Sequence, residues 1–195
     1  MSLLRTFSAA LEARDPYLYG HSTRVTAIAE SLARLLGWPR SQLEALRLGG
    51  SLHDVGKIVV DAQILRKPGA LTAAELTQIR THPVAGARLI RGLIDLRPAR
   101  PYVLHHHERW DGEGYPTRRA GERIPLEARL LCIADAFDAM TSHRAYRPAL
   151  TIDRALGEVE RCAGSQFDPW LAEAFLHGWE RGEIRVAEQV ASAPV

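Results

Sequence analysis

The sequence predicts an all-α protein built as one domain. Two observations carry this prediction: apolar residues recur at helical spacing along most of the chain, and no stretch of any length alternates apolar and polar residues as a half-buried strand would. The 195 residues suffice for one domain with a substantial core. We expect this domain, a helical bundle, to occupy residues 1–185, and residues 186–195 to form a disordered tail.

Apolar periodicity and capping patterns place the helices along the chain. Ser41 followed by Glu44 has the spacing of a capping box, and so has Thr72 followed by Glu75. The stretch 110–123 is rich in glycine, contains a proline and is expected to be an ordered irregular loop. Helices are expected at about residues 3–14, 19–36, 41–54, 72–80, 83–90, 99–109, 126–142, 152–163 and 168–181.

Composition and charge exclude several classes of protein. The 25 Lys and Arg residues nearly balance the 23 Asp and Glu residues, so a nucleic acid polymer is not an expected partner. The most apolar run, 128–140, is too short to span a bilayer, and the N-terminus lacks the apolar segment of a signal peptide. A cytoplasmic protein with no membrane partner is therefore expected. Cys132 and Cys162 fit no disulfide framework and are expected to be buried thiols.

The strongest chemical signal is His53-Asp54, followed closely by Gly56 and Lys57. Adjacent side chains on a helix diverge by about 100°, but at a helix end the chain can unwind and bring an imidazole and a carboxylate onto one metal ion. Such a pair suits Mn, Fe or Zn. Lys57 would add a cation where a phosphate oxygen can meet it. The alternative, an exposed pair at a frayed helix end, is disfavoured by the apolar helix that leads into it.

A second group of signals comes from residues 105–108, His-His-His-Glu, and from a later apolar helix. The three imidazoles are most economically explained by two on a metal site and the third on the outside of the helix. Asp135 and Asp138 interrupt the apolar helix, where buried carboxylates are costly unless they are paired or bind a metal. Asp135 is therefore a candidate ligand, and Asp138 either supports a ligand or accepts from a substrate.

The remaining histidines are weaker signals. His82 precedes Pro83 at a helix start and, taken alone, favours a cap over a metal ligand. For His21, a ligand role and a partly exposed place on a polar helix face are about equally supported. His143 and His177 lack convincing partners and are expected at the surface.

Together these residues supply enough nitrogen and oxygen donors for two adjacent divalent ions. Such a pair activates water and neutralises a phosphate for in-line displacement. The sequence contains no P-loop and none of the motifs of serine or cysteine nucleophiles. Two-metal hydrolysis of a phosphate ester is the chemistry that this pattern favours.

Six motifs of the chain resemble those of the HD-GYP domain, a branch of the HD phosphohydrolase superfamily. They are ARDPYLYGHSTRV (13–25), HDVGK (53–57), His82, HHERWDGEGYP (106–116), ADAFDAMTSHRAYRP (134–148) and GSQFDP (164–169). The resemblance covers about residues 8–180. It is specific through this combination, since HD alone is common to many phosphohydrolases.

The resemblance implies an all-helical HD core and hydrolysis of the bacterial second messenger cyclic di-GMP to linear pGpG, and onward to GMP. It implies two divalent ions, Fe or Mn before Zn, with Asp54 bridging them, Lys57 at the scissile phosphate and the GYP element 114–116 beside the pocket. The implied metal ligands are His21, His53, Asp54, His82, His106, His107 and Asp135. The implied substrate contacts are Lys57, Tyr115, Asp138, Arg144 and Arg147.

The chain departs from the family pattern in two respects. Some relatives bind a third metal through a glutamate one turn before the first-helix histidine, but Tyr17 stands at that place, so two metals are expected. No receiver or sensory domain precedes the motifs, so we expect a free-standing enzyme regulated by a separate sensory, receiver or GGDEF-type protein, or a fragment of a longer protein.

Two other functions stay open at this point. One is hydrolysis of a different cyclic dinucleotide, such as cyclic GMP-AMP. The other is a non-catalytic module that binds a nucleotide or a signalling partner, which is disfavoured because every expected ligand position for two metals is filled. Homodimer formation is likewise open.

Overall fold

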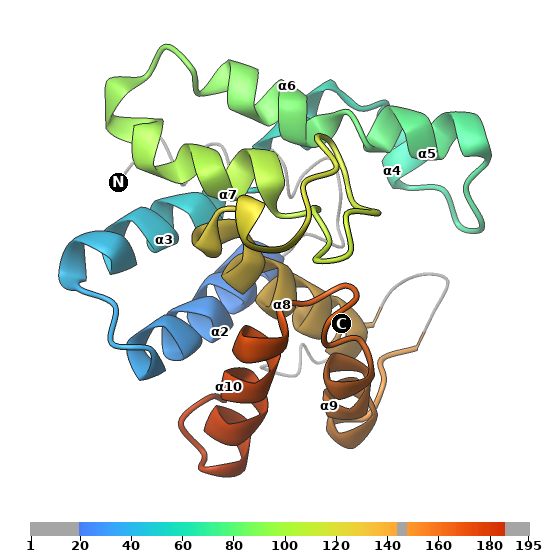
Figure 1. The fold of residues 1–195 in the computed structure, drawn as a ribbon. Helices are drawn as coiled ribbons and strands as arrows, with labels where there is room; N and C mark the ends of the chain where they lie inside the picture. Colours follow the sequence, from blue (N-terminus) through green and yellow to red (C-terminus); the bar gives the residue numbers. More distant parts are fainter. Residues whose placement is uncertain (1–19, 144–147, 186–195) are drawn as a thin grey trace, which may run out of the picture.

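A computed structural model of the chain describes residues 20–143 and 148–185. Within these ranges the structure contains helices and no strand, which confirms the predicted all-α class (Figure 1). The longer helices are α2 (His21–Leu35), α3 (Arg40–Leu52), α5 (Ala73–Ile79), α6 (His82–Leu89), α7 (Arg100–His105), α8 (Leu126–Thr141), α9 (Ile152–Arg161) and α10 (Pro169–Glu180). Shorter turns are η2 (Val55–Val59), α4 (Ala62–Leu65), η3 (Ile94–Ala99) and η4 (Gly121–Arg123).

Several expectations fall outside the described residues. They concern the helix at 3–14, Tyr17, the arginines Arg144 and Arg147, and the tail 186–195. These expectations stay predictions.

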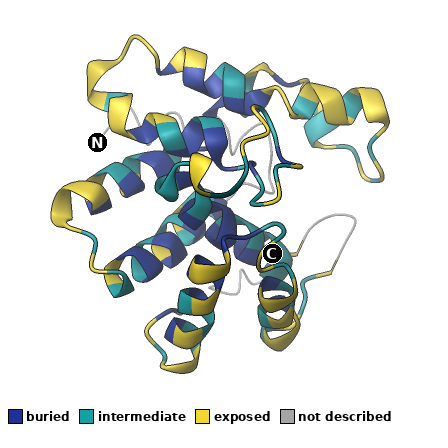
Figure 2. Cartoon of the chain, in the orientation of Figure 1, coloured by how far each residue is buried: buried dark blue, intermediate teal, exposed yellow. Residues whose placement is uncertain are grey.

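The main core forms where α2 packs against α3 and α8. On α2, Val25, Ile28 and Leu32 follow helical spacing and are fully buried, so one stripe of the helix faces the core (Figure 2). Phe137 on α8 meets Phe175 on α10, with ring centres 5.1 Å apart, and this contact fastens α10 to the bundle.

A smaller core lies under the helices α6 and α7. It joins Leu52 and Val55, at the end of α3 and the start of η2, to Ile90, Ala99 and Val103. The two cores adjoin along α3 and α7. The end of α3, the start of α6 and the end of α7 are therefore held close together, and these are the places where the sequence puts its metal-binding motifs.

The helix boundaries test the capping predictions. Thr72 and Glu75 form the predicted capping box at α5, and Pro83 lies in the first turn of α6 as expected. The Ser41 prediction was wrong: α3 begins at Arg40, one residue earlier, with the extended Pro39 as its N-cap and no side-chain cap. The proline ring fixes φ of Pro39 at a value that suits the N-cap position, and Ser41 then falls inside the first turn of α3.

Two further corrections concern the helix before the consecutive histidines and, elsewhere in the chain, the burial of Cys162. The helix expected at 99–109 ends at His105, with the tighter turn η3 before it, so the residues after His105 leave the helical path. Cys132 is buried as predicted, but Cys162 is only half-buried. None of the described helices combines the length and the apolar character needed to cross a membrane.

Candidate metal centre

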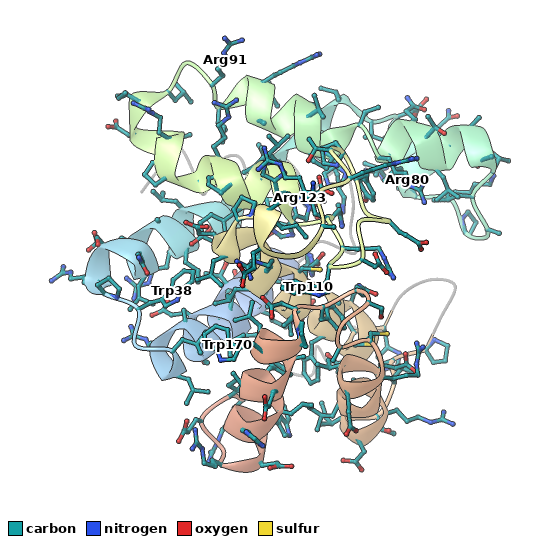
Figure 3. The ribbon with its side chains drawn as sticks, in the orientation of Figure 1. Trp38, Arg80, Arg91, Trp110, Arg123 and Trp170 are labelled. Atoms are coloured by element: carbon teal, nitrogen blue, oxygen red, sulfur yellow. The ribbon has the colours of Figure 1, made fainter. Side chains whose placement is uncertain are left out.

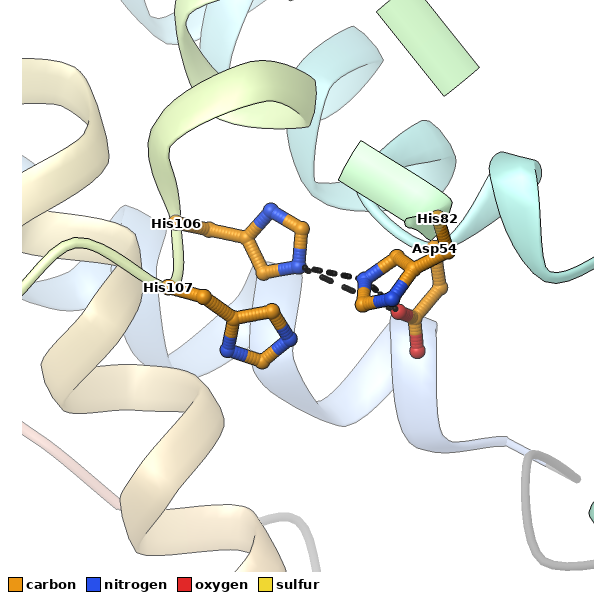
Figure 4. Close-up of side chains that lie close together, drawn as sticks. All are labelled: Asp54, His82, His106 and His107. Carbon is orange, nitrogen blue, oxygen red and sulfur yellow. Dashed lines mark hydrogen bonds and ion pairs between the residues drawn. The ribbon is translucent and has the colours of Figure 1, made fainter. Parts of the chain in front are cut away.

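Separate helical segments deliver imidazoles and carboxylates to one buried place. His53 caps the end of α3, and Asp54 follows it at the start of η2. His82 is the first residue of α6, while His106 and His107 follow the end of α7 (Figure 4). The chain thus turns at each of these points, which frees side chains of neighbouring residues to converge rather than diverge.

Asp54 stands between two groups of histidines. Its Oδ1 lies 3.2 Å from Nε2 of His82 and 3.9 Å from Nε2 of His106. Its Oδ2 faces the other way and lies 3.6 Å from Nε2 of His53. One carboxylate with its two oxygens toward separate histidine groups has the arrangement of a ligand that bridges two cations.

The rings of three of these histidines are oriented in the same way. In each, Nδ1 bonds a backbone carbonyl: His53 to Gly50 at 2.7 Å, His82 to Ile79 at 2.8 Å and His106 to Tyr102 at 3.0 Å. Because a carbonyl only accepts, Nδ1 carries the proton and Nε2 presents a lone pair to the centre. Burial also lowers the pKa of His53 and of His106, which favours the neutral rings that metals bind.

The inward-facing nitrogens fit divalent metal ions. Nε2 of His53 is fully buried and has no hydrogen-bond partner. The Nε2 atoms of His82 and His106 lie only 3.2 Å apart, although both present lone pairs. Such a contact is unfavourable without a cation, whereas two ligands of one ion at about 2.1 Å each lie roughly 3 Å apart. The donor set of imidazoles and carboxylates therefore suits Fe, Mn or Zn.

His21 extends the centre from the start of α2. It is buried, with 4% of its surface exposed, so the partly exposed alternative is wrong. Its Nδ1 lies 2.7 Å from Asp138 and its Nε2 lies 3.2 Å from Oδ1 of Asp135. Burial opposes protonation, but the two carboxylates outweigh it and raise the pKa of His21 to about 9. His21, His53 and Asp54 together offer ligand atoms close enough for one ion.

Asp138 lies behind His21 rather than toward open solvent. Only 1% of its surface is exposed. Besides His21, it accepts from Nε of Arg24 at 2.6 Å. Of the two roles expected for Asp138, this geometry favours support of a ligand over contact with a substrate.

The second group consists of Asp54, His82, His106 and His107, whose ligand atoms are again close enough for one ion. His82 was expected to cap its helix if taken alone, and this interpretation is wrong. Thr81 is the N-cap residue, no side chain caps the helix, and the ring of His82 points into the centre.

Charged and aromatic groups line the approach to the centre. Nζ of Lys57 lies 2.7 Å from Oδ2 of Asp54 and is partly exposed. Burial raises the pKa of a carboxyl, but Lys57 and the adjacent histidines outweigh it and hold the pKa of Asp54 well below its usual range. The ring of Tyr115 stacks on His107, with centres 4.8 Å apart.

Arg80 was missed by the sequence reasoning. It lies at the end of α5 (Figure 3). Its guanidinium carbon lies 5.5 Å from the centre of the Tyr115 ring. Since 35 positions separate it from Tyr115 and no motif includes it, no sequence signal could have found this contact.

Glu108 was also missed as a loop anchor. It is buried, and Oε1 accepts from the backbone and hydroxyl of Thr117 at 2.7 and 2.6 Å, while Oε2 accepts from the backbone of Arg119 at 3.2 Å. His105 was expected on the outer face of the helix, which was wrong: it is 6% exposed and lies beside Glu108. The glutamate in His-His-His-Glu was the available signal. His143 and His177 are exposed as predicted.

Two glycines permit close backbone contacts at the centre. A Cβ on Gly56 would overlap the carbonyl of His82, so η2 can approach α6 only with glycine there. A Cβ on Gly114 would overlap the backbone of Arg109 and the carbonyl of His107. Both glycines therefore set how closely the histidine-bearing segments come together.

Comparison with known proteins gives a consistent set of similarities. A family profile described as "HD domain" matches residues 5–171. The chain is 37% identical over 177 residues to the cyclic di-GMP phosphodiesterase response regulator RpfG of Xanthomonas campestris pv. campestris, covering 90% of this chain and 47% of that protein. It is 41% identical over 170 residues to the cyclic di-GMP phosphodiesterase PA4108 of Pseudomonas aeruginosa, covering 85% and 40%.

Other relatives differ in the substrate that they are named for. The chain is 35% identical over 182 residues to 3'3'-cGAMP-specific phosphodiesterase 2 of Vibrio cholerae, covering 91% of this chain and 34% of that protein. The crystal structure of the V. cholerae cyclic GMP-AMP phosphodiesterase V-cGAP3 matches with a TM-score of 0.67 at 22% identity, covering 93% and 49%. The chain spans less than half the length of each of these relatives.

Proposed function

Because the chain belongs to the HD-domain family, we propose that it is a two-metal phosphodiesterase that hydrolyses cyclic di-GMP to linear pGpG. The observation that carries the proposal is Asp54, whose two oxygens face separate groups of inward-pointing histidine nitrogens. The names of the relatives support the cyclic dinucleotide class. Further hydrolysis of pGpG to GMP is a second step of the same chemistry.

Two groups of residues support two metal positions in this proposal. His21, His53 and Asp54 would hold one ion, with Asp135 adjacent; Asp54, His82, His106 and His107 would hold the other. Bound divalent ions supply positive charge for a phosphate and make water a stronger nucleophile. Fe and Mn are the proposed metals, with Zn as the alternative, since imidazole and carboxylate donors accept all three.

Other residues would act on the substrate directly. Lys57 presents a partly exposed ammonium beside Asp54, where it can bind a phosphate oxygen and stabilise the charge that grows during displacement. Tyr115, fixed against His107, would form a wall for a base, and Arg80 supplies a further cation at that wall. Asp138 would position His21, while Arg144 and Arg147 stay predicted substrate contacts.

Cyclic GMP-AMP is the second candidate substrate, because relatives of comparable identity are named for it. The two substrates share the ring of two phosphodiesters and differ in one base. They can be separated in one assay, and the proposed chemistry is the same for both.

The decisive experiment is chromatographic product analysis. The purified chain is mixed with cyclic di-GMP or with 3'3'-cyclic GMP-AMP, in Mn(II) and, anaerobically, in Fe(II). We expect linear products from the wild type and none from Asp54→Ala, since that substitution removes the shared ligand. Asp95→Ala, at an exposed aspartate in η3, is the matched control and should keep full activity. Equal turnover by Asp54→Ala would exclude the two-metal assignment.

A further inference from the structure

A cavity lies apart from the metal centre. It has a volume of about 560 Å³ and is bounded by the far end of α6, by η3 and α7, and by the loop before α8. Leu96 and Leu104 contribute to its apolar wall. None of the residues assigned to the metal centre lines it.

The cavity is lined by positive charge. Arg91, Arg97, Arg100 and Arg119 reach it from four different segments, and its lining contains no aspartate or glutamate. Within residues 20–143 and 148–185, no ion pair links any of these arginine side chains to a carboxylate. The side chain of Arg119 donates to the carbonyl of Arg123, at 3.3 Å. Four like charges around one cavity repel one another, and an anionic ligand would offset this repulsion.

A buried imidazole also lines the cavity. His105 is 6% exposed, and its Nδ1 has no hydrogen-bond partner. Glu108 lies 3.6 Å from that nitrogen, beyond hydrogen-bond distance. Because this nitrogen is fully buried and lies on the side of Glu108, the imidazole contributes ring surface to the cavity wall, and the arginines remain its polar groups.

We propose that this cavity binds a ligand with a terminal phosphate on a flat body, the chemical class of nucleoside monophosphates and short linear nucleotides. Guanidinium groups bind phosphate through two parallel hydrogen bonds and also stack on flat rings. The apolar wall formed by Leu96 and Leu104 suits the face of a base. The volume lies in the range of small-ligand sites, roughly 300–1,000 Å³.

The volume of the cavity favours a small ligand over a protein segment. Leu93 and Ile94 are exposed beside the cavity, at 42% and 70%, and an acidic peptide could cover them. A compact nucleotide matches the cavity volume and can bring its phosphate to the arginines that line it, so it is the ligand class that we favour. Peptide binding is therefore the competing outcome.

The linear product of the proposed reaction belongs to this ligand class. Assigning pGpG or GMP to the cavity rests on the proposed function, and it would place a product-binding site behind the loop that carries Tyr115. Arg119 provides the connection: its side chain lines the cavity, and its backbone bonds Glu108, which also holds Thr117 near Tyr115. A ligand on Arg119 is thus attached to that loop.

Binding can be tested without turnover. Commercial pGpG and GMP are titrated calorimetrically into the chain with chelator present. The variants are Asp54→Ala, the cavity pair Arg97→Ala with Arg100→Ala, and the control pair Arg40→Ala with Arg154→Ala. The control removes two exposed positive charges from α3 and α9, which do not line the cavity. We expect the wild type, Asp54→Ala and the control pair to bind alike, and the cavity pair to bind at least about tenfold more weakly.

Three results would overturn the inference. They are no binding of either nucleotide by the wild type, unchanged binding by the cavity pair, and binding that is weakened as much in the control pair as in the cavity pair. If the cavity pair unfolds, Arg97→Lys with Arg100→Lys keeps the charge but loses the planar fork, and should still weaken binding. The turnover assay is read separately, so absent nucleotide binding with intact turnover contradicts only the cavity proposal.

Discussion

Asp138 shows how one residue can act on the metal centre through another. Its carboxylate holds Nδ1 of His21 at 2.7 Å and is held in turn by Arg24. A carboxylate behind an imidazole fixes the ring and makes its other nitrogen a stronger donor. Asp138 should therefore control metal affinity at the His21 side of the centre.

Replacing Asp138 with Asn tests this positioning role. The amide keeps the size of the side chain but loses the charge, so we expect metal affinity to fall by about 10–100-fold. Competition with a chromogenic chelator measures it. Asp153→Asn, at an exposed position in the first turn of α9, should leave affinity unchanged. An unaltered metal affinity in Asp138→Asn would show that Asp138 does not support the metal centre.

Lys57 is expected to affect the reaction rather than the metals. Replacing it with Met keeps most of the aliphatic stem and removes the ammonium beside Asp54. We expect kcat to fall by about 10²–10³-fold, the size seen when one stabilising group is lost. Elemental analysis should find both metals retained. Loss of the metals together with activity would show that Lys57 serves the ligand Asp54 instead.

Residues of the centre were predictable where the sequence places a polar residue within or at the end of an apolar helix. His53 and Asp54 end an apolar helix, and Asp135 interrupts another, so burial and a partner could be inferred. The pairing of Asp138 with His21 could not, because 117 positions separate them and only the packing of α2 on α8 brings them together. Arg80 was unpredictable for the same reason.

At the scale of elements, the approach of η2 to α6 depends on Gly56. A Cβ there would overlap backbone atoms of His82 and Gly86, which cannot move aside as a flexible side chain would. We expect Gly56→Ala to lower the free energy of unfolding by about 1–3 kcal/mol. Gly157→Ala is the control: nothing lies near its Cβ on helix α9, so stability should rise by about 0.5–1 kcal/mol. Urea unfolding measures both, and equal stability of the two variants would contradict the close contact.

The loop between α7 and α8 depends on Glu108. Both its oxygens accept hydrogen bonds from the loop, at Thr117 and Arg119. In Glu108→Gln one oxygen becomes an NH₂ group that cannot accept, and a buried donor loses its partner. We expect a loss of about 1–3 kcal/mol in the free energy of unfolding. Glu113→Gln, exposed in the same loop, should change it by less than about 0.5 kcal/mol. A neutral Glu108→Gln would contradict the anchoring role.

Elements were predictable where the signal is local. The capping box at Thr72 and the proline in the first turn of α6 involve neighbours within a few residues, and both predictions were confirmed. The end of α7 was not predictable from periodicity, because the residues through Glu108 are all compatible with a continuing helix. Its true end at His105 is set by distant contacts: His106 points into the centre, while Glu108 turns back to bond the loop.

For the whole molecule, the candidate metal centre lies where the two cores adjoin. His21 and Asp135 come from the part built on α2 and α8, while His82 comes from α6, over the smaller core. Asp54 stands between these groups. Bound metals would therefore link both parts of the fold, and without metal the inward-facing nitrogens repel one another.

Metal ions should accordingly stabilise the entire domain. A ligand that binds only the folded state adds about 2.7 kcal/mol at a concentration 100 times its Kd, and a domain of this size gains about 2–4 °C in Tm for each kcal/mol. We expect Mn(II) at such a concentration to raise Tm by about 5–10 °C, as followed by circular dichroism, and excess chelator to reverse the rise. Asp54→Ala should show little of this rise in Tm, because the substitution removes the ligand that both metal positions share. A shift of equal size in Asp54→Ala would mean that the metal stabilises the chain from another site.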